Sequence, residues 1–338
     1  MCSLIDPVAG FAIPQKWLTR SGLSLPELKR RIDSGLYTLT ASGTLLKRGL
    51  TTGTISAAAA KASVLSIAEP TTQVDILTPI GIRVKVHTTS ADGWARAQKP
   101  RSDHSKDVTE GLIFEAEAFK AVGIQLSLGE GIGIVKKRGL RAPYGTPAIS
   151  PEARWSIENA IGEATRSIGL KGALVKLSAI NGAAISKKTL NEKVGVFGGV
   201  SVLGTTGFVE PWNECLVGSA ENLAETADRV ALTTGRTGFK YAKMYFPDHI
   251  TLIAGSNLER VFQKAEGKET IIIGLPALIL KWAKPDILNE MKADTVQELF
   301  DRDPYAEGIT VALTALKTRT KARIVIIDRA GKIIRDIG

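Results

Sequence analysis

The stretch NEKVGVFGGVSVLGTTGFVEPWNE, residues 191–214, is the point at which the sequence pattern changes and decides the expected fold. It places five glycines between short apolar runs. Glycine inside a strand or helix costs about 0.5–1 kcal/mol relative to alanine. Five glycines in this stretch therefore indicate tight turns or bare backbone held close to a ligand. The run VGVFGGVSVLG predicts a strand, and Pro211–Leu232 predicts a long helix.

Downstream, apolar strands alternate with helices. We expect strands at HITLIAG, ETIIIG and ARIVIID, and helices at SNLERVFQKA, Pro276–Ala283 and Thr295–Phe300. Nearly continuous apolar strands that alternate with helices are typical of a parallel sheet with helices on both faces. We therefore predict that residues 191–338 form a doubly wound, mainly parallel, Rossmann-like α/β domain.

The preceding part of the chain has a mixed pattern. An alanine-rich helix at about Ser56–Ile67 is followed by QVDILTPIGIRVKV, which predicts a hairpin, and by the alternating strand LIFEAEAF. Hairpins mixed with helices predict an α+β domain over residues 46–190. Residues 1–45 form an N-terminal extension, in which SLPELKRRIDSG predicts one helix capped by Ser24 and ended by Gly35.

The composition narrows the class of protein. The 338 residues include 44% hydrophobic and 23% charged residues, as in a soluble globular protein. Two distant cysteines argue against a disulfide framework and a thiolate metal site. The chain starts without a signal-peptide pattern, and its longest apolar run, Ile271–Leu280, is too short to cross a membrane. We expect a cytoplasmic protein without membrane insertion, and the pattern leaves open whether it forms a homo-oligomer.

The charge balance favours anionic partners. The 44 Lys and Arg residues exceed the 34 Asp and Glu residues, for a net charge of +10. Aromatic residues are 6% of the chain and do not interleave with the basic clusters, so we do not expect nucleic-acid binding. One basic cluster, KKRGLR at Lys136–Arg141, is either a solvated face or an anion site.

Two glycine-rich segments are candidate sites. If Gly204-Thr205-Thr206-Gly207 follows a strand of a parallel sheet, its backbone N–H groups lie in the ligand crevice; the alternative is a tight turn. The second segment, Leu128–Arg154, contains Glu130, which is either a general base or an ion-pair partner of Lys136 or Lys137. The three histidines are scattered, so no protein-bound metal is expected.

Four motifs add a family resemblance. RGLTTGTISAAAAKA, KDVTEG, GEGIGIVKKRGLRAPYGTPAISPEAR and NEKVGVFGGVSVLGTTGFVEPW, in this order, resemble the cobalt-precorrin-5B C1-methyltransferase family of anaerobic cobalamin biosynthesis. The resemblance implies methyl transfer from S-adenosylmethionine to C1 of an anionic corrinoid, giving cobalt-precorrin-6A. The cobalt then belongs to the substrate.

The chain departs from the family pattern in three places. Ile55 stands where cysteine is usual, so no covalent role is expected there. Arg101, His104 and Ser105 stand where carboxylates are usual, and Leu275–Leu278 lacks the usual His and Lys. These positions leave room for altered chemistry on the same fold.

Together, the motifs and the resemblance predict the site. We expect Gly204, Thr205, Thr206 and Gly207 to approach the cofactor, and Glu130 to tune a neighbouring cation or act as a base. We expect the Lys187–Asn191 junction to line a cleft between domains. Two rival functions remain, a non-catalytic carrier for an anionic tetrapyrrole and a nucleotide-binding enzyme. The residues expected to orient the substrate's carboxylates are Thr51, Thr52, Thr54, Lys136, Lys137, Arg141 and Lys188.

Overall fold

The computed structural model describes residues 4–104, 107–137, 142–211 and 223–338. These residues form two compact units, and each is described by itself. The 47–211 unit comprises residues 33–37 and 47–211, and the 212–338 unit comprises residues 1–32, 38–46 and 212–338. Both mix helices with sheets, so the expected mixed α/β class is confirmed.

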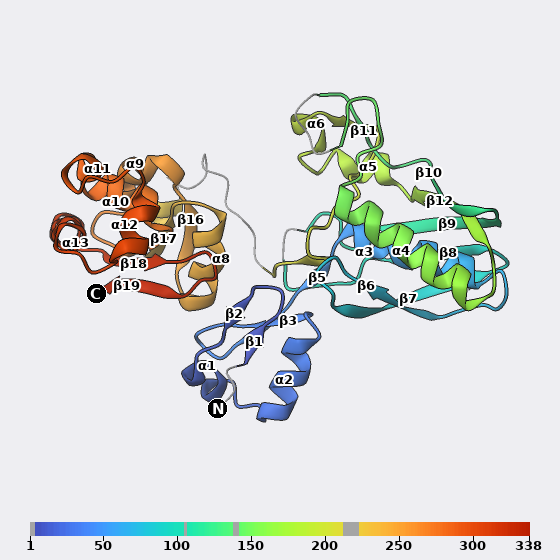
Figure 1. Ribbon diagram of the computed structural model, residues 1–338, viewed down its shortest axis with the longest axis horizontal. Helices are drawn as coiled ribbons and strands as arrows, with labels where there is room; N and C mark the ends of the chain where they lie inside the picture. Colours follow the sequence, from blue (N-terminus) through green and yellow to red (C-terminus); the bar gives the residue numbers. More distant parts are fainter. Residues whose placement is uncertain (1–3, 105–106, 138–141, 212–222) are drawn as a thin grey trace. The chain divides into compact units, whose positions relative to one another are not determined.

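The 47–211 unit is built on a six-stranded sheet (Figure 1). Neighbouring strands are antiparallel except for the parallel pair β10–β12. Along β9 the buried residues Phe114, Ala116 and Ala118 alternate with more exposed ones, among them Glu115 and Glu117, as expected for a sheet with one covered face. The strands, in sheet order, are β10 (Gly123–Leu128), β12 (Gly172–Ala179), β9 (Ile113–Lys120), β8 (Trp94–Gln98), β7 (Arg83–Ala91) and β6 (Gln73–Leu77).

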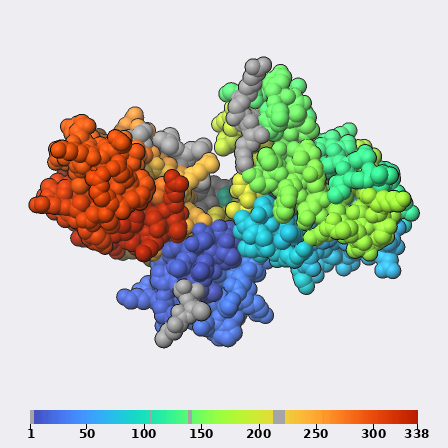
Figure 2. Space-filling model, in the orientation of Figure 1, coloured from blue at the N-terminus to red at the C-terminus, as the bar shows by residue number. Residues whose placement is uncertain are grey.

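Helix α3 (Thr52–Leu65) is the centre of this unit. Twelve of its 14 residues are buried, among them Ala57–Ala60. A helix that is apolar all round must be covered on every side, and α3 packs against both the sheet and α4 (Pro151–Ser167). The small alanine side chains allow this close approach. In the space-filling view, the green residues of α4 lie on the surface of the unit (Figure 2).

The first turn of α3 binds a distant segment through hydrogen bonds. The Thr52 hydroxyl donates to the Ser201 carbonyl at 3.0 Å and accepts from the Leu203 N–H at 2.8 Å. The Gly53 N–H donates to the Leu203 carbonyl at 2.8 Å, and the Thr54 hydroxyl donates to the Gly207 carbonyl at 2.9 Å. The segment 201–207 is therefore attached to the start of α3.

Glycines allow this segment to pack closely. A Cβ on Gly204 would lie 2.4 Å from Thr51 Oγ1, and a Cβ on Gly207 would lie 2.7 Å from Thr78 Cβ. Both glycines have positive φ, +156° and +90°. A Cβ on Gly53 would lie 2.7 Å from the Cβ of Ala153 in α4. These glycines serve tight turns and backbone packing, one of the two explanations that the sequence left open.

Short elements complete the unit. The expected strand VGVFGGVSVLG is mostly wrong, because only β13 (Val196–Phe197) is a strand, while Val200 and Val202 make isolated bridges to Ile132 and Ile149. The Gly204–Gly207 loop leads into β14 (Phe208–Val209), which pairs with β5 (Gly49–Leu50). It therefore does not end a strand of a parallel sheet. The other elements are β11 (Ile134–Val135), α5 (Gly182–Ser186) and α6 (Asn191–Val194).

The 212–338 unit contains a five-stranded sheet in which only the last strand is antiparallel. The predicted strands HITLIAG, ETIIIG and ARIVIID are confirmed as β16, β17 and β18. The first strand, β15, lies within the expected helix Pro211–Leu232, so that prediction is wrong at its C-terminal end; residues 212–222 lie outside the described residues. The strands are β16 (Ile250–Ile253), β15 (Arg229–Thr233), β17 (Glu269–Gly274), β18 (Arg323–Ile327) and β19 (Ile333–Ile337).

Two cores cover the two faces of this sheet. On one face, Val230, Leu232 and Ile272 pack against α9, α10, α12 and α13. On the other face, Ala231 and Ile271 pack against α8 and the N-terminal extension. The helices are α8 (Arg236–Tyr245), η1 (Gly255–Asn257), α9 (Leu258–Lys264), α10 (Pro276–Ala283), α11 (Ile287–Glu290), α12 (Val296–Arg302) and α13 (Glu307–Thr320).

The N-terminal extension is thus part of a core. Phe11 and Trp17 are buried, with ring centroids 5.4 Å apart, and the Tyr241 hydroxyl donates to the Ala9 carbonyl at 3.0 Å. The predicted Ser24 cap is present, since its hydroxyl accepts from the Glu27 N–H. The elements here are β1 (Ile5–Asp6), β2 (Phe11–Ala12), α1 (Gln15–Arg20), α2 (Leu25–Asp33), β3 (Tyr37–Leu39) and β4 (Leu45–Lys47).

The compact units differ from the domain ranges expected from the sequence. Residues 191–211, expected in the Rossmann-like domain, lie in the 47–211 unit, and most of residues 1–45 lie in the 212–338 unit. Among the described helices, none combines the length and apolarity needed to cross a membrane.

An ion-pair network joins α3, α4 and β7. Glu163 of α4 contacts Lys61 Nζ of α3 at 2.6 Å and Arg83 Nη2 of β7 at 2.7 Å. The hydrogen bond from Arg83 lowers the pKa of Glu163 to about 2, against the opposing effect of burial and with further help from Lys61. The charged carboxylate therefore stabilises the fold.

We predict that Glu163→Gln lowers the free energy of unfolding at neutral pH by roughly 1–3 kcal/mol, because Lys61 and Arg83 lose their charged partner and Lys61 keeps only its bond to the Asp75 carbonyl. A lowered folded-state pKa gives stability above the usual pKa near 4.5, and this stability is lost as pH falls toward about 2. Denaturant titrations from pH 7 to pH 2 should show a smaller acid loss in the variant. Glu158→Gln on the exposed side of α4 is the control and should match the parent. If Glu163→Gln and the parent lost the same unfolding free energy between pH 7 and pH 2, the account would be contradicted.

We predict that Gly204→Ala destabilises the 47–211 unit by at least about 2 kcal/mol, because the new Cβ meets Thr51 and the backbone has positive φ. Thr51→Ala alone removes a helix cap and should cost about 1 kcal/mol. The double variant should be less destabilised than the sum, because Thr51→Ala removes the colliding Oγ1. Calorimetric melting measures all three, and strict additivity would show that the two residues are not in contact.

Candidate functional site

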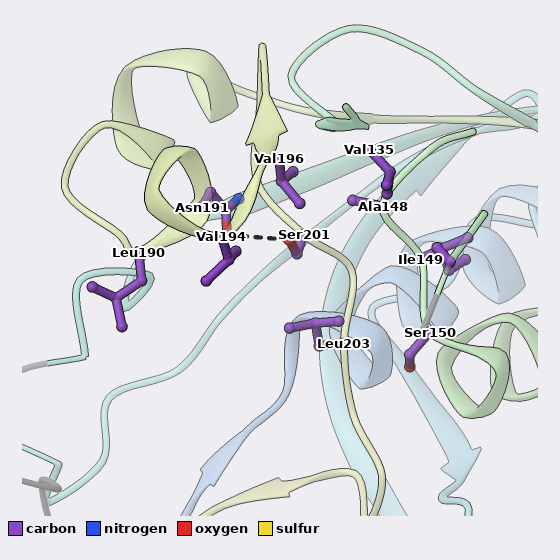
Figure 3. A pocket seen from close by; sticks show the side chains of 11 residues that line it. Val135, Ala148, Ile149, Ser150, Leu190, Asn191, Val194, Val196, Ser201 and Leu203 are labelled. Carbon is purple, nitrogen blue, oxygen red and sulfur yellow. Dashed lines mark hydrogen bonds between the residues drawn. The ribbon is translucent and has the colours of Figure 1, made fainter. Parts of the chain in front are cut away.

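A pocket of about 280 Å³ lies within the 47–211 unit (Figure 3). Its walls are mainly apolar, since three of its 11 lining residues are polar. An apolar pocket with a few convergent polar groups is the usual form of a small-molecule site. The lining residues are Val135, Ala142, Ala148, Ile149, Ser150, Leu190, Asn191, Val194, Val196, Ser201 and Leu203.

Several distant segments supply the walls. Val135 of β11 pairs with Val196 of β13, and Ile149 bridges to Val202 beside Leu203. Leu203 is 52% exposed and is held by its two backbone hydrogen bonds to the first turn of α3. The start of α3 therefore positions one wall of the pocket.

The polar lining groups have fixed orientations. Asn191 Nδ2 donates to the Gly199 carbonyl at 2.9 Å. Its Oδ1 accepts from the Ser201 hydroxyl at 3.1 Å, the bond drawn as a dashed line in Figure 3. Ser150 caps α4 by accepting from the Ala153 N–H. Because both ends of the Asn191 amide are bonded, this side chain holds the α6 wall in place.

Four lysines lie next to residues of the apolar pocket in the sequence. Lys136 and Lys137 directly follow Val135, and the Lys136 N–H donates to the Gly195 carbonyl at 2.8 Å. Lys188 and Lys193 flank Leu190 and Val194 in sequence, and all four lysines are exposed. In the part of the chain that the structure describes, none of them makes an ion pair. Arg141 lies outside the described residues. The pocket therefore suits a ligand with an apolar body and anionic substituents.

The predicted threonines have internal partners. Thr51 accepts from the Thr54 N–H as the cap of α3, and the hydroxyls of Thr52 and Thr54 bond to the segment 201–207. Their contact with substrate stays a prediction, whereas their observed contacts hold the wall formed by Leu203. Leu190 and Asn191, from the junction expected to line a cleft, lie in the pocket of a single unit.

The Gly204–Gly207 loop adjoins the same wall. Thr205 is exposed, while the Thr206 hydroxyl accepts from the Phe208 N–H at 3.2 Å. The loop was expected to bind a cofactor because it would follow a strand of a parallel sheet. That expectation of the fold is wrong, because the loop lies outside any parallel sheet and leads into β14, which pairs antiparallel with β5. Cofactor contact by these four residues stays a prediction.

Glu130 lies in a different pocket. This polar pocket is lined by Glu115, Glu117, Lys176 and Ser178 on the open face of the sheet, together with Glu130. Among the described residues, Glu130 makes no ion pair with Lys136 or Lys137, so the expected direct pairing is absent. Its catalytic role stays a prediction. No group of three or more His, Cys, Asp or Glu side chains in the described ranges is arranged to hold a metal ion.

Asp107 of the KDVTEG motif forms a buried ion pair with Lys99, which the sequence did not predict. Lys99 contacts Asp107, and its Nζ also donates to Thr109 Oγ1 at 2.7 Å. Burial lowers the pKa of Lys99. Burial alone would raise the pKa of Asp107, but hydrogen bonds from Lys99 and Thr109 outweigh it and hold that pKa below its usual value. The 8-residue spacing from Lys99 to Asp107 carried no recognisable signal.

Ser102 connects this loop to the start of α3. A Cβ on Gly49 would lie 3.2 Å from Ser102 Oγ, and the Lys47 N–H donates to Asp103 at 2.7 Å. Gly49 lies in β5, which leads directly to Thr51. Residues of the other two motifs therefore meet the first turn of α3, through Ala153 and the segment 201–207, while the loop that precedes KDVTEG reaches β5 just before it.

Known proteins are similar to this chain in sequence. The family model CbiD matches residues 39–211. Cobalt-precorrin-5B C(1)-methyltransferase of Methanococcoides burtonii is 44% identical over 99% of both chains, and that of Methanosarcina acetivorans is 44% identical over 98% of both.

A solved structure also resembles this chain. The crystal structure of a cobalamin biosynthesis protein (cbiD) from Archaeoglobus fulgidus has a TM-score of 0.57 and 34% identity, and the match covers 96% of this chain and 100% of that one. The chain therefore belongs to the cobalt-precorrin-5B C(1)-methyltransferase family.

Proposed function

We propose that this protein transfers a methyl group from S-adenosylmethionine to C1 of cobalt-precorrin-5B, giving cobalt-precorrin-6A. The observation that carries the proposal is the apolar pocket, which is lined mostly by residues of two of the family's motifs and whose lining residues have exposed lysines beside them in the sequence. The names of relatives that match the chain over nearly its full length supply the substrate.

The pocket suits part of the corrinoid. A corrin macrocycle has apolar faces and carries acetate and propionate carboxylates at its rim. A volume of about 280 Å³ accommodates one edge of such a ring against Leu190, Val194 and Leu203. Lys136, Lys137 and Lys188 then supply positive charge for the carboxylates. The same role for Arg141, which lies outside the described residues, stays a prediction.

The chemistry needs positioning more than acid–base groups. C1 of the macrocycle supplies the electron pair for the new C–CH₃ bond. The S–CH₃ bond breaks, and sulfur keeps the electron pair of that broken bond as neutral S-adenosylhomocysteine leaves. Such a displacement depends on in-line approach at about 3–3.5 Å. Apolar walls that exclude water and an Asn191–Ser201 pair that fixes their shape serve this requirement.

The proposed function also bears on the fold of the 212–338 unit and on the compartment of the enzyme. Parallel strands with helices on both faces support a doubly wound, Rossmann-like arrangement in the 212–338 unit. A biosynthetic enzyme that uses a small anionic substrate and S-adenosylmethionine fits the cytoplasm, with no role for nucleic acid.

We predict that anaerobic incubation with cobalt-precorrin-5B and methyl-labelled S-adenosylmethionine places one label in the corrinoid. Val194→Trp should reduce the rate by at least about tenfold, because the indole fills the pocket. Val122→Trp is the matched control, since Val122 is 80% exposed and lies outside the pocket, and it should act like the parent.

Mass spectrometry of the corrinoid measures transfer. A parent protein that binds both ligands but transfers no label over hours would contradict the proposed reaction. A Val194→Trp variant as active as Val122→Trp would leave the reaction intact but place the substrate elsewhere.

A further inference from the structure

Another cavity lies at the carboxyl edge of the sheet in the 212–338 unit. It has a volume of about 200 Å³ and is lined by the loop after β15 and by the start of α10. The four motifs that resemble the family lie outside this cavity, although Leu275–Leu278, which departs from the family pattern, supplies part of its wall. The lining residues are Thr234, Gly235, Arg236, Thr237, Gly238, Leu275, Ala277 and Leu278.

The strand order places this cavity at a switch point. β15 pairs in parallel with β16 on one side and with β17 on the other. The chain leaves β15 for α8, which packs on one face, and leaves β17 for α10, which packs on the other face. Where successive connections diverge to opposite faces, a crevice opens beyond the carboxyl ends of the strands, and ligands of open parallel sheets bind there.

The loop after β15 has glycines suited to this position. A Cβ on Gly238 would lie 2.9 Å from the Ile273 carbonyl and 3.2 Å from Thr233 Cβ, so glycine allows α8 to start directly against the sheet. Gly235 differs, because a Cβ there would meet no atom within 4 Å. Its backbone is extended, with φ of 171°. Open space, rather than neighbouring protein, lies beside Gly235.

The lining chemistry favours a nucleoside. Leu275, Ala277 and Leu278 supply apolar surface, on which a purine ring can lie. Thr234 and Thr237 are half-buried, and their hydroxyls make no hydrogen bond with any described residue. They are available to the polar edge of a base or to ribose hydroxyls.

We propose that this cavity binds the adenosine part of S-adenosylmethionine. The proposal rests on the proposed methyl transfer and places the donor's nucleoside at Thr234–Gly238 instead of Gly204–Gly207. The loop after β15 lies at the carboxyl end of a strand in a parallel sheet, as was expected of Gly204–Gly207.

The test uses S-adenosylhomocysteine as an unreactive probe and the full-length chain. Gly235→Val adds bulk to the cavity at an extended position with open space, and Ala277→Phe adds bulk from the opposite wall. Both should melt within about 2 °C of the parent and bind the probe at least tenfold more weakly in calorimetric titration. Adenosine should displace the probe from the parent.

Val311→Phe is the matched control, because Val311 of α13 is 56% exposed and lies outside the cavity. It should bind the probe within twofold of the parent. If Gly235→Val or Ala277→Phe melts normally and binds with parental affinity, the donor lies elsewhere, although the methyl-transfer reaction stands. A parent that binds no probe and transfers no label overturns both proposals.

Discussion

The structure of the 47–211 unit depends on the buried first turn of α3. Thr51 closes the helix end, while Thr52, Gly53 and Thr54 use their hydroxyls and backbone to hold the segment 201–207. A helix that is buried on every side leaves no room for larger residues at this end. The Thr-Thr-Gly-Thr motif and the glycine-rich segment are therefore two halves of one packing arrangement.

This arrangement explains how a pocket forms without an evident catalytic residue. Leu203 is presented to the pocket by its bonds to α3, and Asn191 and Ser201 fix the opposite wall. The lysines remain outside, where charge is well solvated and attracts anions at long range. A methyl transfer that depends on positioning needs such a rigid wall more than it needs a general base.

Local signals in the sequence predicted several elements well. The Ser24 cap, the hairpin QVDILTPIGIRVKV and the helix Pro276–Ala283 depend on neighbouring residues, and all three are present. The sequence did not reveal that Arg229–Thr233 is a strand, because a short apolar run fits either a strand or a helix. It also misjudged VGVFGGVSVLG, whose partners Ile132 and Ile149 lie more than 50 residues away. The N-terminal extension is similar, since only tertiary packing shows that Phe11 and Trp17 complete a core.

Hydrogen–deuterium exchange of the full-length chain, with and without cobalt-precorrin-5B under anaerobic conditions, tests the central claim most directly. If the motifs gathered by α3 form the corrinoid site, backbone amides of residues 148–150 and 190–203 should exchange at least tenfold more slowly with substrate. Backbone amides of β8 and β9 in the six-stranded sheet should exchange at the same rate with and without substrate. Saturating substrate that leaves residues 190–203 unprotected, while slowing exchange elsewhere, would contradict the account.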